Sequence, residues 1–551
     1  MSRIKKIIVG SLLGVVMIGL FAFNSIEDRY FEIAKNLDIF ATLFKEVNAF
    51  YVDEINPNEL VRTGINAMLN SLDPYTDYIP EDDIENYRTM TTGQYGGIGA
   101  LVGKRGNYNT IIMPYEGYPA HEAGLQIGDQ IIKINNINLE NKKTDEISKL
   151  LKGQSKTEIN LTIQRYGAKE TFDILLKREK ITINNVPYYG MINNHVGFIK
   201  LSDFTTDAGK EVRDALAELK GKGASKLILD LRGNPGGLLD EAINVSNVFV
   251  AKGAEIVSTK GKVTSWNKTY TAPAEPVDIE LPLAVLTSSG SASAAEIVAG
   301  VIQDYDRGVL VGRKTYGKGL VQATRPLSYN SQLKITTAKY YIPSGRCIQA
   351  IDYSNRNEDG SVGRMPDSLK VAFETRNGRT VYDGGGVDPD VAVNEIKFAS
   401  ITIALITKNL LFDYATKYHY EHKTIANPNT FKLADEEYLE FGDWLSDKDL
   451  TYETSVERTL GQLEKAAKEE RYYDDIKAEL DSFSEAAEKN KEDDLQRFKE
   501  EISYVLEEEI VSRYYLESGI VEASFDNDSD ILAAIEVLED SERYQNLLKG
   551  E

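Results

Sequence analysis

The stretch from Ser288 to Gln322 reads SSGSASAAEIVAGVIQDYDRGVLVGRKTYGKGLVQ, and the rest of the chain is organised around it. A run of small residues opens it, an apolar segment with helical spacing follows, and the apolar run 309–311 then predicts a strand. Residues 282–286 predict another strand just before, so we expect a βαβ unit with its small-residue turn at the carboxyl edge of a sheet. A serine there would lie beside the free N–H groups of a helix N-terminus, where negative charge is stabilised.

A serine hydroxyl is a weak nucleophile and needs a base. The chain has four histidines, none in a stretch that resembles a site, and it has no G-x-S-x-G motif. The remaining candidate is Lys318, because its flanking glycines let the backbone come close and burial under apolar neighbours can keep a lysine amine neutral. Gln322 lies four residues on, where its amide can orient the amine from the same face. The expected apolar cover comes from Val311, Tyr316, Leu320 and Val321.

The pattern G-S-A-S-A-A-E-I followed by K-T-Y-G-K-G-L-V-Q resembles the carboxyl-terminal processing proteases, serine peptidases of family S41 with a Ser/Lys dyad. This resemblance implies that Ser293 is the nucleophile, Lys318 the general base and Gln322 its partner. It covers roughly residues 35–395 and includes three further motifs. These are L-D-P-Y-T at 72–76, D-L-R-G-N-P-G-G at 230–237 and Y-I-P-S-G-R at 341–346.

The resemblance also implies an oxyanion site made from backbone N–H groups. Ala294 supplies one donor and the Gly-Gly turn the other, for which we favour Gly237 over Gly236. Asp230 and Arg232 in the same motif are expected to form a structural ion pair. No metal and no cofactor is implied, and the core is expected to have the α/β fold of ClpP and the crotonases.

Residues 91–180 resemble a PDZ domain of the bacterial protease type. In that family a G-G-I-G turn presents N–H groups to the carboxylate of a peptide's C-terminus, and the peptide adds beside it as a strand. Gly97, Ile98 and Gly99 match those positions. Where many relatives have an arginine before the glycine that closes the PDZ helix, this chain has Lys152, which puts a bidentate contact there in doubt.

The N-terminus predicts a membrane-associated, exported protein. Residues 7–23 are almost wholly apolar and follow Arg3, Lys5 and Lys6, which is typical of a secretory signal or a membrane anchor. No clear A-x-A cleavage site follows, so we favour an uncleaved anchor, with the basic flank in the cytoplasm and the rest exported. The net charge of -23 argues against nucleic acid as a partner.

The sequence as a whole predicts a multidomain α/β fold with an inserted PDZ domain. Between anchor and PDZ domain, apolar residues at helical spacing predict a helical region that packs and could dimerise. The acidic tail predicts a C-terminal α-helical extension that could dimerise, bind a partner or cover the cleft. The expected segments are an anchor at 1–24, helices at 30–90, the PDZ domain at 91–180, the protease core at 181–395 and the extension at 396–551.

The function predicted is a serine endopeptidase that captures the unstructured C-termini of exported proteins and cleaves them. Two alternatives stay open. One is a non-catalytic PDZ scaffold of the cell envelope. The other is a thioester enzyme of the crotonase type, since that fold also stabilises oxyanions with paired N–H groups.

Overall fold

The computed structural model describes residues 30–356, 361–395, 397–491 and 493–550. The chain divides into two units, residues 1–78 and residues 79–551. The predicted anchor, residues 7–23, lies outside the described residues. Within the described residues, no helix is both long and apolar enough to cross a membrane.

Two helices make up most of the described part of the first unit, residues 30–78, as the sequence predicts, and strand β1 (Asp77–Ile79) begins at its end. Residues 30–50 form one helix, and α2 (Pro57–Asn70) forms the other, with the Asn56 side chain accepting hydrogen bonds at its N-terminus. The predicted apolar stripe on the first helix is largely exposed, with Leu37 64% and Phe40 51% accessible. A homodimer through this region stays a prediction.

The PDZ domain is an antiparallel sheet of order β3-β4-β5-β7-β8 that packs around an apolar core with α5. Strand β3 is at the edge of the sheet and contacts α5, so an edge strand borders the helix. Strands β2 and β9 pair with each other and join the domain to the rest of the unit. The elements are α3 (Ile84–Thr92), β2 (Gln94–Gly97), β3 (Ala100–Arg105), β4 (Tyr108–Pro114), α4 (Pro119–Glu122), β5 (Gln130–Ile134), β6 (Ile137–Asn138), α5 (Thr144–Leu151), β7 (Glu158–Gln164), β8 (Phe172–Lys177) and β9 (Glu179–Thr182).

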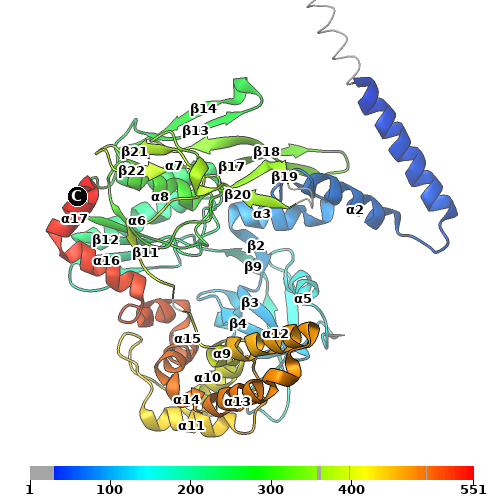
Figure 1. Cartoon of the computed structure of the whole chain (residues 1–551), viewed down its shortest axis with the longest axis vertical. Helices are drawn as coiled ribbons and strands as arrows, with labels where there is room; N and C mark the ends of the chain where they lie inside the picture. The colour runs from blue at the N-terminus through cyan, green and yellow to red at the C-terminus, as the bar shows by residue number, and fades with distance from the viewer. Residues whose placement is uncertain (1–29, 357–360, 396, 492, 551) are drawn as a thin grey trace, which may run out of the picture. The chain divides into compact units, whose positions relative to one another are not determined.

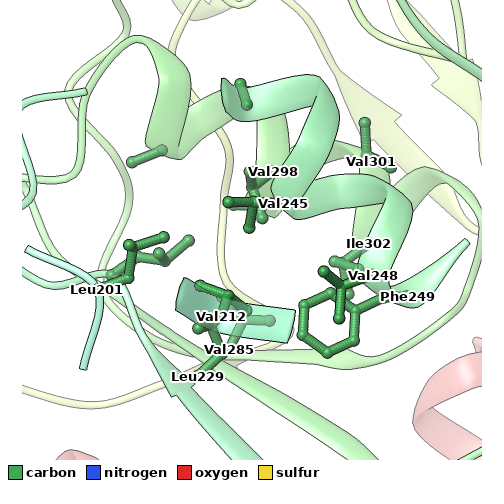
Figure 2. Close-up of a cluster of buried hydrophobic side chains, with 14 of the residues drawn as sticks. Leu201, Val212, Leu229, Val245, Val248, Phe249, Val285, Val298, Val301 and Ile302 are labelled. Atoms are coloured by element: carbon green, nitrogen blue, oxygen red, sulfur yellow. The ribbon is translucent and has the colours of Figure 1, made fainter. Parts of the chain in front are cut away.

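The protease core is built on a six-stranded sheet of order β10-β11-β12-β15-β16-β23, parallel except for β10. Helices α6, α7 and α8 cover one face, where Val212, Val245, Val298 and Ile302 meet strand residues such as Leu229 (Figure 2). The elements are β10 (Tyr188–Met191), β11 (Val196–Lys200), α6 (Ala208–Gly221), β12 (Lys226–Asp230), α7 (Leu239–Phe249), β15 (Leu283–Thr287), α8 (Ala294–Asp304), β16 (Val309–Gly312) and β23 (Val391–Ala392).

A second, antiparallel sheet carries the segment after Lys318. Strand β18 pairs with β13 on one side and with β17 on the other, and β13 also pairs with β14. Short elements complete this part of the core. The bounds are β13 (Glu255–Gly261), β14 (Lys268–Thr271), β17 (Leu320–Pro326), β18 (Gln332–Tyr341), β19 (Ile351–Arg356), β20 (Val362–Arg364), β21 (Ala372–Glu374) and β22 (Thr380–Tyr382).

The C-terminal extension is helical, as predicted, but it has two parts with different surroundings. Helices α9 to α11 and the first half of α15 surround an apolar core of their own. The last helices instead pack on the second face of the central sheet (Figure 1). The helices are α9 (Ser400–Thr407), α10 (Leu410–Glu421), α11 (Asp435–Leu445), α12 (Ser455–Glu470), α13 (Tyr473–Lys491), α14 (Asp494–Arg497), α15 (Lys499–Ser524), α16 (Ser529–Glu539) and α17 (Ser541–Lys549).

Helix α15 links these two parts and changes direction at Leu516, whose backbone is not helical (φ 54°, ψ −148°). After the kink, Val521 and Phe525 join the cluster on the second face of the sheet. The predicted extension, residues 396–551, therefore contains two parts that pack on different surfaces. Helical spacing predicts which side of a helix is apolar but not which surface it covers.

The first part of the extension also contacts the PDZ domain. The ring of Tyr420 on α10 stacks on Tyr166 at 5.6 Å between centroids, and the guanidinium of Arg105 lies 3.4 Å from the centroid of the Phe412 ring. The extension therefore contacts both the PDZ domain and the protease core. That it dimerises, binds a partner or covers the cleft stays a prediction.

Candidate active site

Ser293 occupies the turn between β15 and α8, at the residue just before the helix begins. Its backbone has φ 56° and ψ −113°, a conformation that residues with a side chain seldom adopt. Such strain persists only where the surroundings hold it, and it concentrates at functional sites. The residue is half-buried, while Ala292 and Ala294 on either side are buried.

A buried carboxylate, Glu296, joins the serine segment to the lysine segment. Its Oε2 accepts hydrogen bonds from the N–H of Ser293 and from the N–H of Lys318, each at 2.8 Å. Its Oε1 accepts from the N–H of Gly317 at 2.7 Å and from the hydroxyl of Thr315 at 2.6 Å. Burial raises the pKa of this carboxyl group, and the four donors act against that rise. One side chain therefore fixes the backbone of both predicted dyad residues.

Tyr340 on β18 makes a second connection between the same two segments. Its hydroxyl lies 3.1 Å from the carbonyl oxygen of Ser293 and also contacts the carbonyl oxygen of Lys318. The side chain is almost completely buried. The backbones of residues 293 and 318 are thus held together through both their N–H groups and their carbonyl groups.

Glu296 and Tyr340 are residues of the candidate site that the sequence did not predict. For Glu296 a signal was present, because Ser293 followed three residues later by a glutamate is the pattern of a capping box. That pattern accounts for the contact with Ser293 but not for the contacts with Gly317 and Lys318, which are tertiary. No local pattern marks Tyr340.

Lys318 lies between β16 and β17 in a segment that needs its glycines. A Cβ on Gly317 would lie 2.4 Å from the Cβ of Ala350, and the N–H of Gly319 donates to Oε1 of Gln349 at 2.7 Å. Lys318 is half-buried. Gln322 follows on β17, where its Nε2 donates to the hydroxyl of Thr336 at 3.2 Å.

The apolar cover predicted for Lys318 is only partly present. Leu320 is buried and Val321 is half-buried. Tyr316, by contrast, is 41% exposed, and Val311 packs in the cluster on the other face of the central sheet. Alternate residues of a strand point to opposite faces, so closeness in sequence did not bring Val311 to the lysine side.

The glycine turn after β12 lies directly against Ser293. A Cβ on Gly236 would lie 2.7 Å from the Cβ of Ser293 and 2.8 Å from the backbone nitrogen of Ala294. Asn234, fully buried, holds the turn by accepting from the N–H of Gly236 at 2.8 Å and donating to the carbonyl of Leu201 at 2.7 Å. Only glycine fits so close an approach of two backbones.

The two N–H groups predicted to bind an oxyanion belong to Gly237 in the glycine turn and to Ala294, the residue after Ser293. Within the described part of the chain, the N–H groups of Gly237 and Ala294 donate to no protein acceptor. Gly237 is exposed, and its neighbour Leu238 donates to the carbonyl of Phe204. Unsatisfied N–H groups at the start of a helix and in a glycine turn suit an anionic oxygen.

The predicted ion pair between Asp230 and Arg232 is present, at 2.8 Å between Nη2 and Oδ2. Both residues belong to the motif that ends in the glycine turn, so this ion pair fixes the backbone just before the turn. No group of acidic, histidine or cysteine side chains arranged to hold a metal ion is found among the described residues.

The G-G-I-G turn of the PDZ domain lies between β2 and the edge strand β3. Ile98 is buried, and Gly99 has φ 73°, with the Cβ of Tyr118 only 2.4 Å from where its own Cβ would be. The N–H of Gly153 donates to the carbonyl of Gly96, which joins the turn to the end of α5.

The side chains of Lys152 and Arg178 both form hydrogen bonds near the C-terminal end of α5. The amine of Lys152 donates to Oδ1 of Asn86 at 3.3 Å and lies over the ring of Tyr95. Arg178 donates to the carbonyls of Leu150 and Leu151 at 2.8 and 2.9 Å. A guanidinium is therefore present at this helix end, although it comes from Arg178, a position that no sequence motif marks.

Comparisons with known proteins agree with this architecture. The family model for peptidase family S41 matches residues 195–354, and a PDZ domain model matches residues 111–165. A carboxy-terminal-processing protease of Bartonella bacilliformis is 36% identical over 341 residues, which cover 61% of this chain and 77% of that protein. A protein named "Probable CtpA-like serine protease" from Staphylococcus aureus (strain MRSA252) is 32% identical over 410 residues, covering 73% of this chain and 75% of that protein.

The chain belongs to peptidase family S41, the carboxy-terminal-processing proteases. A solved structure of a photosystem II D1 C-terminal processing protease covers 64% of this S41 protease and 92% of its own chain, at 25% identity and a TM-score of 0.35. The extension of the S41 protease also matches a family model, "Probable PDZ-protease, C-terminal helical domain", over residues 401–538. Membership of a peptidase family leaves the thioester-enzyme alternative without support.

Proposed function

We propose that this protease cleaves peptide bonds with Ser293 as nucleophile, Lys318 as general base and Gln322 as the partner that orients the lysine amine. The observation that carries the proposal is the Glu296 carboxylate, whose Oε2 accepts from the N–H groups of both Ser293 and Lys318 at 2.8 Å. A carboxylate that binds two backbone segments in this way keeps the serine and the lysine in one small site.

In the proposed reaction, the neutral amine of Lys318 takes the proton of the Ser293 hydroxyl as its oxygen attacks the peptide carbonyl. The N–H groups of Gly237 and Ala294 bind the oxyanion of the tetrahedral intermediate. Each such donor typically contributes about 2.7 to 4 kcal/mol in the transition state. The lysine ammonium then protonates the leaving amine, and water hydrolyses the acyl-enzyme.

The substrates proposed are exported proteins with unstructured C-terminal tails. The carboxylate of the tail binds at Gly97, Ile98 and Gly99, and the tail adds as a strand beside β3. The unpaired edge position of β3 next to α5 supports this mode of binding. The relative from Bartonella carries carboxy-terminal processing in its name, which agrees with a substrate of this kind.

The test of the dyad is cleavage of a protein with an apolar, unstructured C-terminal tail by Ser293→Ala and Lys318→Ala variants. We expect both to lose activity by several orders of magnitude. Ser289→Ala and Lys314→Ala are matched controls, because Ser289 is exposed in the same turn and Lys314 pairs with Asp388 outside the site. Full cleavage by either dyad variant would refute the proposal and would favour the alternative, a non-catalytic scaffold.

We also propose that the protein is exported and held at the membrane by residues 7–23. The apolar run after a basic flank supports this. The full chain should sediment with membranes and resist alkaline extraction, while a chain that lacks residues 1–24 should not. Full extraction of the complete chain at alkaline pH would contradict a membrane anchor.

A further inference from the structure

The N-terminus of α16, in the C-terminal extension, lies where the strands of the protease core end. Asp528 caps this helix by accepting the N–H groups of Asp530 and Ile531 at 2.9 and 3.1 Å. Asp530 is buried, with only 3% of its side chain exposed. Asp528 pairs with Arg232, and Asp530 pairs with both Arg232 and Arg313; each arginine lies shortly after a strand of the central sheet. The tail of the chain therefore reaches the end of the sheet from which the site segments emerge.

The first arginine, Arg232, follows β12 and precedes the glycine turn. Its Nη1 contacts Oδ2 of Asp528 at 2.7 Å and Oδ2 of Asp530 at 3.0 Å. The other edge of the guanidinium pairs with Asp230. Asp530 thus contacts the segment that leads to Gly236 and Gly237.

The second arginine, Arg313, follows β16 and begins the segment that leads to Lys318. Its Nη2 lies 3.3 Å from the same oxygen, Oδ2 of Asp530. The backbone of Arg313 is bonded to Thr287, the last residue of β15, through its N–H at 2.9 Å and its carbonyl at 2.8 Å. The serine turn begins at the next residue, so Arg313 is attached to the segments on both sides of the dyad.

We propose that Asp530 is a positioning residue for peptide hydrolysis, because one of its oxygens binds the arginine before the glycine turn and the arginine before the lysine segment. This inference rests on the proposed function. The site needs the oxyanion donors and the general base in a fixed relation, although they leave the sheet on different strands. Displacements of about 1 Å can reduce a rate about 100-fold. The C-terminal extension is then part of the catalytic unit.

The two arginines should respond differently when the carboxylate is removed. Arg232 keeps Asp230 and Asp528 as partners. Within the described residues, Asp530 is the one carboxylate that pairs with Arg313. Its loss should therefore release the lysine segment more than the glycine turn.

The experiment compares Asp530→Asn with Glu539→Gln in the full-length protein. Glu539 ends the same helix and pairs with Lys226 at the start of β12, at 2.7 Å, so it anchors α16 at the opposite end of the strand. We expect Asp530→Asn to lower kcat about 10- to 100-fold with KM changed less than twofold, and Glu539→Gln to change neither. Thermal unfolding of each variant measures the loss of stability separately.

A kcat for Asp530→Asn equal to that of Glu539→Gln would overturn the proposal. If Asp530→Asn does not fold, Arg313→Gln tests the same contact from its more exposed side, and a full kcat there would also overturn it. The Ser293→Ala variant distinguishes a failure of the proposed dyad from a failure of the proposed role of Asp530. Activity retained by Ser293→Ala refutes the proposed dyad itself, whereas an inactive Ser293→Ala with a fully active Asp530→Asn refutes only the role of Asp530.

Discussion

The central sheet of the protease core has two faces, and they are covered by segments of different origin. Helices α6, α7 and α8 cover one face, and each follows a strand of the same sheet by a short connection. Helices α16 and α17 cover the other and come from more than 130 residues beyond β23. Strand residues alternate between the faces, with Leu229 and Val285 on one side and Ile228 and Ala284 on the other.

This difference shows that the helical tail is not an appendage of the catalytic core. Side chains of the sheet, such as Phe198, would be exposed to water without the last helices, and burying one large apolar side chain contributes about 1.5–3 kcal/mol. The face with local helices carries the candidate site, while the distant helices complete the core from the far side.

The largest effect should come from removing the distant cover. A chain that ends at Ser524 loses α16 and α17 and exposes the second face of the sheet. We expect the truncated protein to be insoluble or unfolded, because a large apolar patch exposed to water promotes aggregation. Expression and gel filtration measure this. A soluble, monomeric and active truncated protein would show that the second face does not need its helices.

The next effect concerns the site on the first face. Glu296→Gln keeps the size of the side chain but replaces one acceptor oxygen by an NH2 group, which cannot accept from a backbone N–H. In one orientation of the amide the bonds from Ser293 and Lys318 are lost, and in the other the bond from Gly317 is lost. We expect a loss of at least about 100-fold in kcat and of about 3 kcal/mol in the free energy of unfolding. Steady-state kinetics and denaturant unfolding measure both. An unchanged kcat would exclude the carboxylate as the link between the two segments.

A matched pair of substitutions sharpens the comparison of the faces. Ile302 on the first face and Ile531 on the second are both fully buried. Replacing either with alanine should lower the free energy of unfolding by about 2–5 kcal/mol. If both faces belong to one cooperative core, each variant shifts the same unfolding transition. A separate early transition in Ile531→Ala alone would indicate that the tail unfolds independently.

The smallest effect should come from the exposed pair at the end of α16. The hydrogen bond from Lys226, and then that from His195, lowers the pKa of Glu539 below its ordinary value. A lowered carboxylate pKa stabilises the fold above the unfolded-state value and loses that contribution as pH falls through the folded-state value. Glu539→Gln should cost at most about 1 kcal/mol near pH 7 and nothing in acid. Denaturant unfolding at both pH values measures it, and a loss that grows in acid would contradict the pair.

Much of the candidate site could be proposed from the sequence because its residues occur in motifs. The order of Ser293, Lys318 and Gln322, the glycine turn and the PDZ signature identified the family, and alternation and helical spacing predicted the fold class. The contacts that hold the site together could be predicted less well from the sequence. Glu296 had a visible local role in its capping pattern, but nothing in the sequence marked its bonds to Gly317 and Lys318.

The sequence by itself determined which chemical groups are present, in what order, and which sides of the helices and strands are apolar. Those properties depend on residues a few positions apart, so they can be read locally. Only the tertiary structure decided that the last helices cover the second face of the sheet, that Tyr340 joins the backbones of residues 293 and 318, and that Asp530 meets Arg232 and Arg313. These contacts join residues far apart in the chain, and apolar packing and charge pairing allow many partners until the whole fold selects one.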